Sequence, residues 1–202
     1  MPKTDSDLGA LLYIYETEPT TGYIVKGSYI SESIPTTASK FALGCEITNR
    51  NTGYVYHNRG TVASPVWELG VMSKTVSLSA ADIIAMYATP VAIVPAVPGK
   101  AIILDSMEFD ITRTSTAFTG GGVVAVQYNS TANGAGTATT ATIAATVVTG
   151  AAGRTITARI PVVQSDIATA SITGIGLYIS NATAAFAAGT GTATVKVKYH
   201  LV

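Results

Sequence analysis

The chain has 202 residues, of which 48% are hydrophobic and only 12% are charged, and its formal net charge is +0. Its basic residues are scattered, whereas binding to nucleic acid requires clustered positive charge. One cysteine excludes an intrachain disulfide and a zinc site built from cysteines, and no apolar run approaches the roughly 20 residues of a membrane-spanning helix. We therefore expect no nucleic-acid partner, no membrane contact and no metal or other cofactor. The first residues lack the layout of a signal peptide, so we expect synthesis in the cytoplasm.

The composition changes near residues 71–74. Most of the tyrosines and the only tryptophan precede this point, and a chain rich in Ala, Thr, Gly and Val follows it, with few charges between Arg113 and Lys196. This change predicts two parts. The first is a small β-rich N-terminal domain or arm, residues 1–72, and the second is a β-sandwich domain, residues 73–202.

The first part is typical of short strands joined by turns. Apolar, aromatic and β-branched runs bounded by polar residues predict strands at 11–15, 41–48 and 66–69. Asn51-Thr52-Gly53 predicts a turn, and residues 54–56 follow it as a return strand.

A helical pattern interrupts the strands at residues 77–87. A serine N-cap, an acidic residue in the first turn and apolar residues near helical spacing predict a helix of two to three turns that ends before Pro90.

Beyond this helix, alternation with a period of two dominates. In 155–162, for example, Ile156 and Ala158 share a face opposite Thr155 and Thr157. The same reasoning predicts strands at 107–112, 123–128, 175–180 and 194–201, and the Ile and Val of 142–149 also favour a strand. Together these patterns predict an all-β protein whose second domain is an antiparallel sandwich, similar to a jelly roll, with one short helix.

Few residues suggest chemistry. His57 and His200 have no adjacent nucleophile motif, so each is interpreted as exposed or hydrogen-bonded. Glu108 and Asp110 share one strand face and are the only candidate carboxylate pair, although two solvated acids on an outer strand face are the commoner explanation. Cys45 is expected to be a small core residue. We expect no catalytic site and no enzyme activity.

The aromatic residues of the first part leave one alternative open. Trp67, Tyr54 and Tyr56 could stack on sugar rings in a groove, or they could pack the interior of the small domain.

Two stretches resemble bacteriophage virion proteins. The first comprises residues 35–45 and 51–67, with Thr52-Gly53, then Tyr56-His57-Asn58-Arg59-Gly60-Thr61, then Ser64-Pro65-Val66-Trp67. It is similar to a segment of small head-associated and fibre-associated proteins. The second comprises residues 76–90, 98–106 and 118–121, and it is similar to a β-sandwich module of phage virion proteins.

The resemblance implies a structural protein of the virion that forms homotrimers. The function that fits it best is a capsid decoration, or cement, protein that binds the major capsid protein. On this hypothesis the N-terminal segment contacts the capsid through Leu11, Leu12 and Tyr13. The alternative function is a tail-fibre or adhesion module that recognises host carbohydrate, and a polysaccharide-degrading enzyme is a third hypothesis.

Overall fold

The computed structural model describes residues 3–4, 11–30, 40–51, 53–159 and 168–202, and it divides into two compact units, Met1–Met72 and Ser73–Val202. Strands dominate both units, and the only α-helices among the described residues are two short ones in the second unit. The expected all-β fold class is therefore confirmed. Parts of the predicted elements, Thr52 of the turn and residues 160–162 of a strand, lie outside the described residues.

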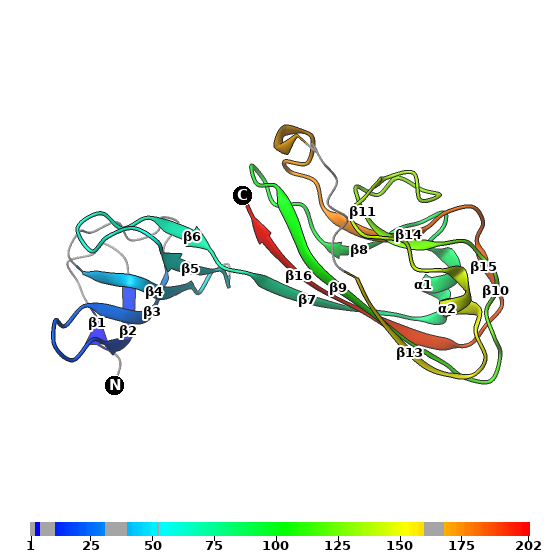
Figure 1. The fold of residues 1–202 in the computed structure, drawn as a ribbon, viewed down its shortest axis with the longest axis horizontal. Helices are drawn as coiled ribbons and strands as arrows, with labels where there is room; N and C mark the ends of the chain where they lie inside the picture. Colours follow the sequence, from blue (N-terminus) through cyan, green and yellow to red (C-terminus); the bar gives the residue numbers. More distant parts are fainter. Residues whose placement is uncertain (1–2, 5–10, 31–39, 52, 160–167) are drawn as a thin grey trace. The chain divides into compact units, whose positions relative to one another are not determined.

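Unit 1 is a six-stranded sheet in chain order, β1-β2-β3-β4-β5-β6 (Figure 1). Its strands are β1 (Lys3–Thr4), β2 (Leu11–Thr17), β3 (Ile24–Ile30), β4 (Phe41–Asn49), β5 (Val55–Asn58) and β6 (Trp67–Leu69). The pair β3–β4 is parallel and the others are antiparallel. The core consists of buried apolar side chains from β3 and β4: Ile24, Tyr29, Phe41, Cys45 and Ile47.

Unit 2 contains two four-stranded sheets. One has the order β13-β9-β16-β7 and the other the order β12-β11-β14-β8. Their strands are β7 (Met72–Leu78), β8 (Val91–Val94), β9 (Ile102–Arg113), β11 (Val124–Tyr128), β12 (Thr137–Ala138), β13 (Gly153–Arg159), β14 (Leu177–Asn181) and β16 (Gly191–Leu201). A two-stranded ribbon of β10 (Thr119–Gly120) and β15 (Phe186–Ala187) and a 3-10 turn, η2 (Thr169–Ser171), complete the unit.

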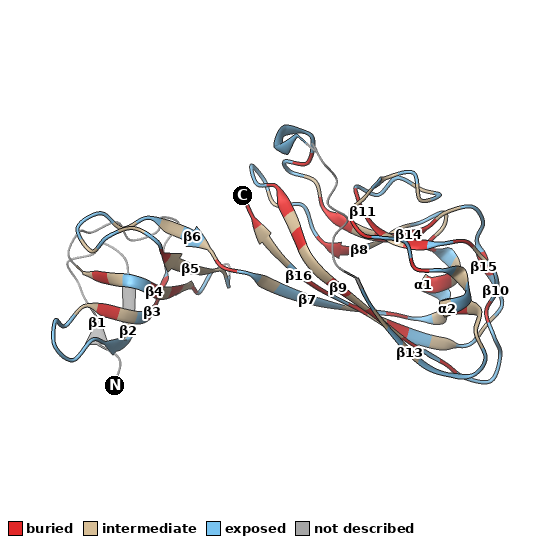
Figure 2. Ribbon diagram, viewed as in Figure 1, coloured by how far each residue is buried: buried red, intermediate tan, exposed pale blue. Residues whose placement is uncertain are grey.

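The strands of the two sheets alternate along the chain, from β7 to β8, β9 and β11 and then from β13 to β14 and β16. This alternation, with the orders β7-β16-β9-β13 and β8-β14-β11-β12, is the arrangement of an eight-stranded jelly roll. Buried residues lie on strands of both sheets (Figure 2). Tyr128 on β11 also donates a buried hydrogen bond to the carbonyl oxygen of Ile102 on β9, at 2.7 Å, and so joins the sheets.

The predicted helix is present as α1 (Ala80–Ala85), although it begins later than predicted because β7 continues to Leu78. Its N-cap is Ser79, whose hydroxyl accepts a hydrogen bond from the backbone of Asp82 while the Asp82 carboxylate accepts one from the backbone of Ser79. This reciprocal pair is a capping box that satisfies two free donors at the helix start. Hydrogen bonds from Ser79 hold the pKa of Asp82 below its usual value; the bond from the Ser79 side chain has the largest effect, and the bond from its backbone adds to it.

Two predictions for unit 2 are wrong. The segment 142–149 is not a strand, because Ala145–Thr149 forms a second helix, α2. In β13 the expected alternation is present but inverted. Ile156 and Ala158 are exposed, and Thr155 points to the inner side, where its hydroxyl accepts a hydrogen bond from buried Arg113 at 2.8 Å. The polar partner that Arg113 requires explains this inversion.

Candidate interaction surface

The carboxylate pair proposed from the sequence lies on the outer face of β9, but its two acids have different surroundings. The guanidinium group of Arg154 on β13 donates two hydrogen bonds to the carboxylate of Asp110, from Nε to Oδ1 at 3.0 Å and from Nη2 to Oδ2 at 2.6 Å. These hydrogen bonds from Arg154 hold the pKa of Asp110 below its usual value. Asp110 is thus a paired, ionised group, which is unsuited to acid catalysis.

The two histidines lie in different units. His57 is on β5, in register with Glu46 and Glu68 on the neighbouring strands. His200 is on the polar face of β16, as its strand alternation predicts, and its Nδ1 lies 2.9 Å from Oδ1 of Asp105. Asp105 is the extra residue of a β-bulge in β9, because Lys198 pairs with Ser106 and Tyr199 already pairs with Leu104.

The aromatic residues of unit 1 contribute to its core. The Trp67 and Phe41 rings meet edge to face with centroids 5.1 Å apart, and those of Tyr56 and Tyr29 lie 6.5 Å apart. Trp67 and Tyr56 are partly buried against the core, and Tyr54 is partly buried beside β5. Packing therefore occupies part of the surface that a sugar ring would need.

The segment around Asn58-Arg59-Gly60 acts as a structural clamp. Asn58 is fully buried, and its amide donates to the carbonyl oxygens of Phe41 and Ala42 at 3.3 and 3.0 Å. Its Oδ1 accepts hydrogen bonds from the backbone of Gly60 and Val66, both at 3.0 Å. One side chain thus joins β4, the end of β5 and the loop before β6.

The glycine of this segment is required by space. A Cβ on Gly60 would lie 2.3 Å from the carbonyl oxygen of Ser64 and 2.5 Å from the backbone nitrogen of Val66. Backbone atoms cannot yield as a flexible side chain does, so any larger residue must displace the loop. Asn58 and Gly60 therefore both have a structural role in this loop.

Leu11, Leu12 and Tyr13 belong to the sheet of unit 1. They are paired with Ile30, Tyr29 and Ser28 of β3. The backbone of this segment is therefore a strand and not a free arm, while its side chains lie outside the described part of the structure. The proposed contact with a capsid through these side chains stays a prediction.

Cys45 is fully buried, as expected for a core residue. Burial, together with the nearby charge of Glu46, raises the pKa of its thiol to about 12. Burial likewise raises the pKa of Tyr29 to about 12. Both groups are thus neutral in the native unit at physiological pH, and the thiol is a poor nucleophile.

We expect unit 1 to lose stability in alkaline solution. Because the pKa values of Cys45 and Tyr29 are higher in the folded state, the unfolded chain releases these protons first, and stability falls as the pH rises from 9 towards 12. Urea unfolding followed by the fluorescence of Trp67, the only tryptophan, measures unit 1 specifically. Tyr29→Phe should reduce the loss above pH 10, and an identical loss in this variant would contradict the assignment to Tyr29.

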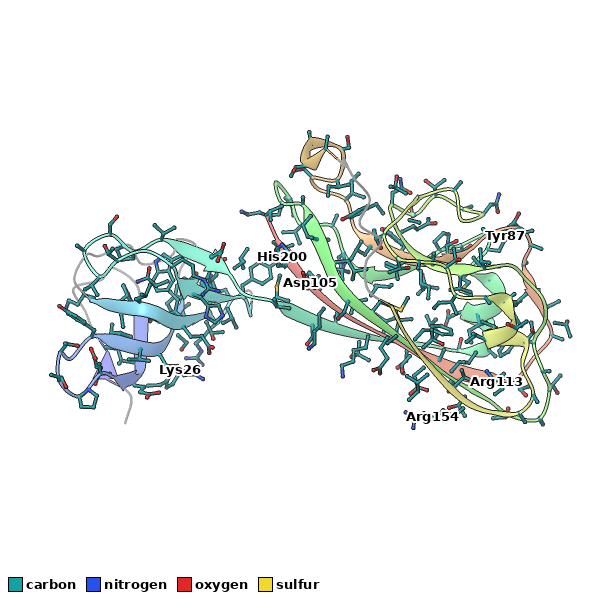
Figure 3. All side chains as sticks on the ribbon, viewed as in Figure 1. Lys26, Tyr87, Asp105, Arg113, Arg154 and His200 are labelled. Atoms are coloured by element: carbon teal, nitrogen blue, oxygen red, sulfur yellow. The ribbon has the colours of Figure 1, made fainter. Side chains whose placement is uncertain are left out.

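The surface with the most distinctive chemistry is the outer face of the sheet β13-β9-β16-β7. Six of the charged side chains of unit 2 lie on it, and the ion pairs of Arg154 and His200 lie towards opposite ends of the sheet (Figure 3). The six are Asp105, Glu108, Asp110, Arg154, Lys196 and Lys198. By contrast, residues 114–153 and 167–195 contain no Asp, Glu, Lys or Arg. The alternation of β9 and β16 predicted each polar face, but the pairing of these two strands could not be read from the sequence.

Among the described residues, no three His, Cys, Asp or Glu side chains lie close enough together to hold a metal ion. In the same part of the chain, no helix is long and apolar enough to cross a membrane.

No protein-family model, curated protein or solved structure matches the chain.

Proposed function

We propose that the chain is a non-enzymatic structural component of a bacteriophage particle, and that it decorates the shell by binding the major capsid protein. The observation that carries the proposal is the jelly roll of unit 2, with six of its twelve charged residues on one sheet face and long uncharged segments elsewhere. Jelly rolls build viral capsid proteins and also lectins. Fold alone does not decide between such functions, so the proposal also depends on the surface and on the resemblance.

The uncharged surface supports an assembly function. The segment 114–153 contains no Asp, Glu, Lys or Arg, and Ala, Thr and Gly dominate it. The buried centres of protein interfaces are depleted in charged residues. The uncharged surface of unit 2 is therefore suited to contact with neighbouring subunits of a shell.

The sugar-binding alternative has less support from the geometry of unit 1. Its candidate residues Trp67 and Tyr56 use part of their ring surfaces for the core. A stacking platform for sugars needs an aromatic face that is free to accept the ring.

Immunogold labelling of intact particles with an antibody against this chain tests the proposal. We expect label distributed over the head. Label confined to the tail would contradict the decoration function and favour carbohydrate recognition, which quenching of Trp67 fluorescence by host sugars would then measure. Purified particles without label, although they contain the chain by mass spectrometry, would show that it is not displayed on the surface.

A second measurement tests the proposed contact residues. We expect simultaneous replacement of Leu11, Leu12 and Tyr13 by Ser to abolish binding to particles that lack the protein. The far-UV circular dichroism and thermal transition of unit 2 should be unchanged, because these residues belong to the sheet of unit 1. Retained binding would exclude this segment as the contact.

A further inference from the structure

The charges on the outer sheet face of unit 2 form two stripes of opposite sign on neighbouring strands. Glu108 pairs in register with Lys196, and Ser106 pairs with Lys198. The acidic stripe on β9 consists of Asp105, Glu108 and Asp110, and the basic stripe on β16 consists of Lys196, Lys198 and His200.

In the part of the chain that the structure describes, the centre of this pattern has no ion pairs. Asp110 is bound by Arg154 and Asp105 by His200, at the two ends of the stripes. Within the described ranges Glu108, Lys196 and Lys198 take part in no ion pair. Lys196 and Lys198 are exposed, and Glu108 is half-buried.

We propose that this face binds a second copy of the same chain, face to face, about a two-fold axis that runs parallel to β9 and β16 between them. Such an axis places the acidic stripe of each copy over the basic stripe of the other. Since Glu108 and Lys196 are register partners, each Glu108 then faces Lys196 of the second copy. The four central charges form a square of alternating sign, which is a self-complementary contact of the kind that a two-fold axis requires.

The charges also exclude the other simple arrangement. An axis in the plane of the face but perpendicular to the strands would place β9 over β9 and β16 over β16, with like charges opposed. Opposed like charges suppress an arrangement. Packed sheets lie about 10 Å apart, which long side chains such as Glu and Lys can span from both sides.

This contact does not depend on the virion assignment, and it is separate from the three-fold contact that the resemblance implies. The two are distinguished by mass. Sedimentation of the full chain in about 10 mM salt, where the Debye length is about 30 Å, should show dimers, or hexamers if both contacts form, which revert to monomers or trimers in about 1 M salt. Only monomers or trimers in the low-salt buffer would overturn the proposal.

Charge reversal tests the geometry. Glu108→Lys gives a copy with only positive charge at the central pair, and Lys196→Glu gives one with only negative charge. We expect each variant alone to associate about tenfold or more weakly, whereas an equimolar mixture should associate at least as strongly as the native chain. Mixing cannot repair a pair within one chain, so recovery reports a contact between copies.

A matched control separates this effect from net charge and folding. Lys100→Glu makes the same change at an exposed residue in the loop before β9, where the backbone carbonyl of Lys100 accepts a hydrogen bond from Gly174. This variant should leave the two-fold association unchanged. The thermal transition of each variant establishes that unit 2 is folded. Folded variants that do not recover on mixing would overturn the proposed axis.

Discussion

Asn58→Asp is expected to unfold unit 1 or to leave it barely stable at neutral pH. The two side chains have nearly the same shape, but the carboxylate replaces an amide group that donates to two carbonyl oxygens, at 3.3 and 3.0 Å. A buried anion would then face two acceptors in a site with no solvent exposure. Breaking such a network by one substitution costs about 3 kcal/mol or more of the free energy of unfolding.

The effect should depend on pH. Burial raises the pKa of the introduced carboxyl group above that of the unfolded chain, because desolvation disfavours the anion. The protonated acid can donate one of the two lost hydrogen bonds, so the deficit is smallest at acid pH and grows as the pH rises through the folded-state pKa. Asn58→Ala lacks this dependence and should cost about 3 kcal/mol at every pH.

The fluorescence of Trp67, which pairs with Asn58 across β5 and β6, follows the unfolding of unit 1 in urea. Asn51→Asp is the control, because it makes the same change at an exposed turn residue of the same unit. A urea midpoint for Asn58→Asp equal to that of the control would show that the clamp does not stabilise the unit.

The sequence predicted those strands and helices whose pattern of apolar and polar residues matches the buried and exposed faces that they have in the structure. The alternation of β16 and the central part of β9 is present, with the apolar residues inside. Helix α1 has the serine N-cap and the first-turn acid that predicted a helix, although it begins after residue 77. Among the described strands of four or more residues, three were not predicted. β3 contains Lys26-Gly27-Ser28, which weakens its strand pattern, β7 overlaps the residues assigned to the helix, and β8 is a four-residue apolar run between prolines.

The candidate surface could be predicted only in part. The polar face of each strand follows from alternation, but the charge stripes exist because β16, at the end of the chain, lies beside β9. Such a pairing of distant segments is set by topology and not by local pattern. The clamp of Asn58 has the same origin, since Phe41 and Asn58 come from different strands.

The error at α2 has a specific cause. Thr146, Val147 and Val148 favour a strand by their β-branched side chains, but the segment forms a helix with no side-chain cap at Ala144. Buried Arg113 donates to the carbonyl oxygens of Val147 and Ala151, at 2.5 and 2.7 Å. A tertiary contact thus satisfies free carbonyl groups at the helix end and overrides the local preference.

Arg113→Ala is therefore expected to destabilise unit 2 by about 3 kcal/mol, because three acceptors, including the Thr155 hydroxyl, lose their donor. Arg113→Lys should recover only part of this loss, since an ammonium group lacks the planar fork that reaches three acceptors. The loss should appear as a lower midpoint in thermal unfolding followed by circular dichroism. Hydrogen exchange should accelerate first in residues 145–151.

Arg154→Ala is the matched control on the strand next to β9. Its guanidinium group is exposed and binds Asp110 at the surface, so its removal should change the midpoint far less than removal of Arg113. If both variants shift the midpoint equally, or if residues 145–151 keep their protection without Arg113, the helix is held by the burial of Val148 instead. If protection is lost there selectively, one buried cation decides that this segment is a helix and that β13 presents its threonines to the interior.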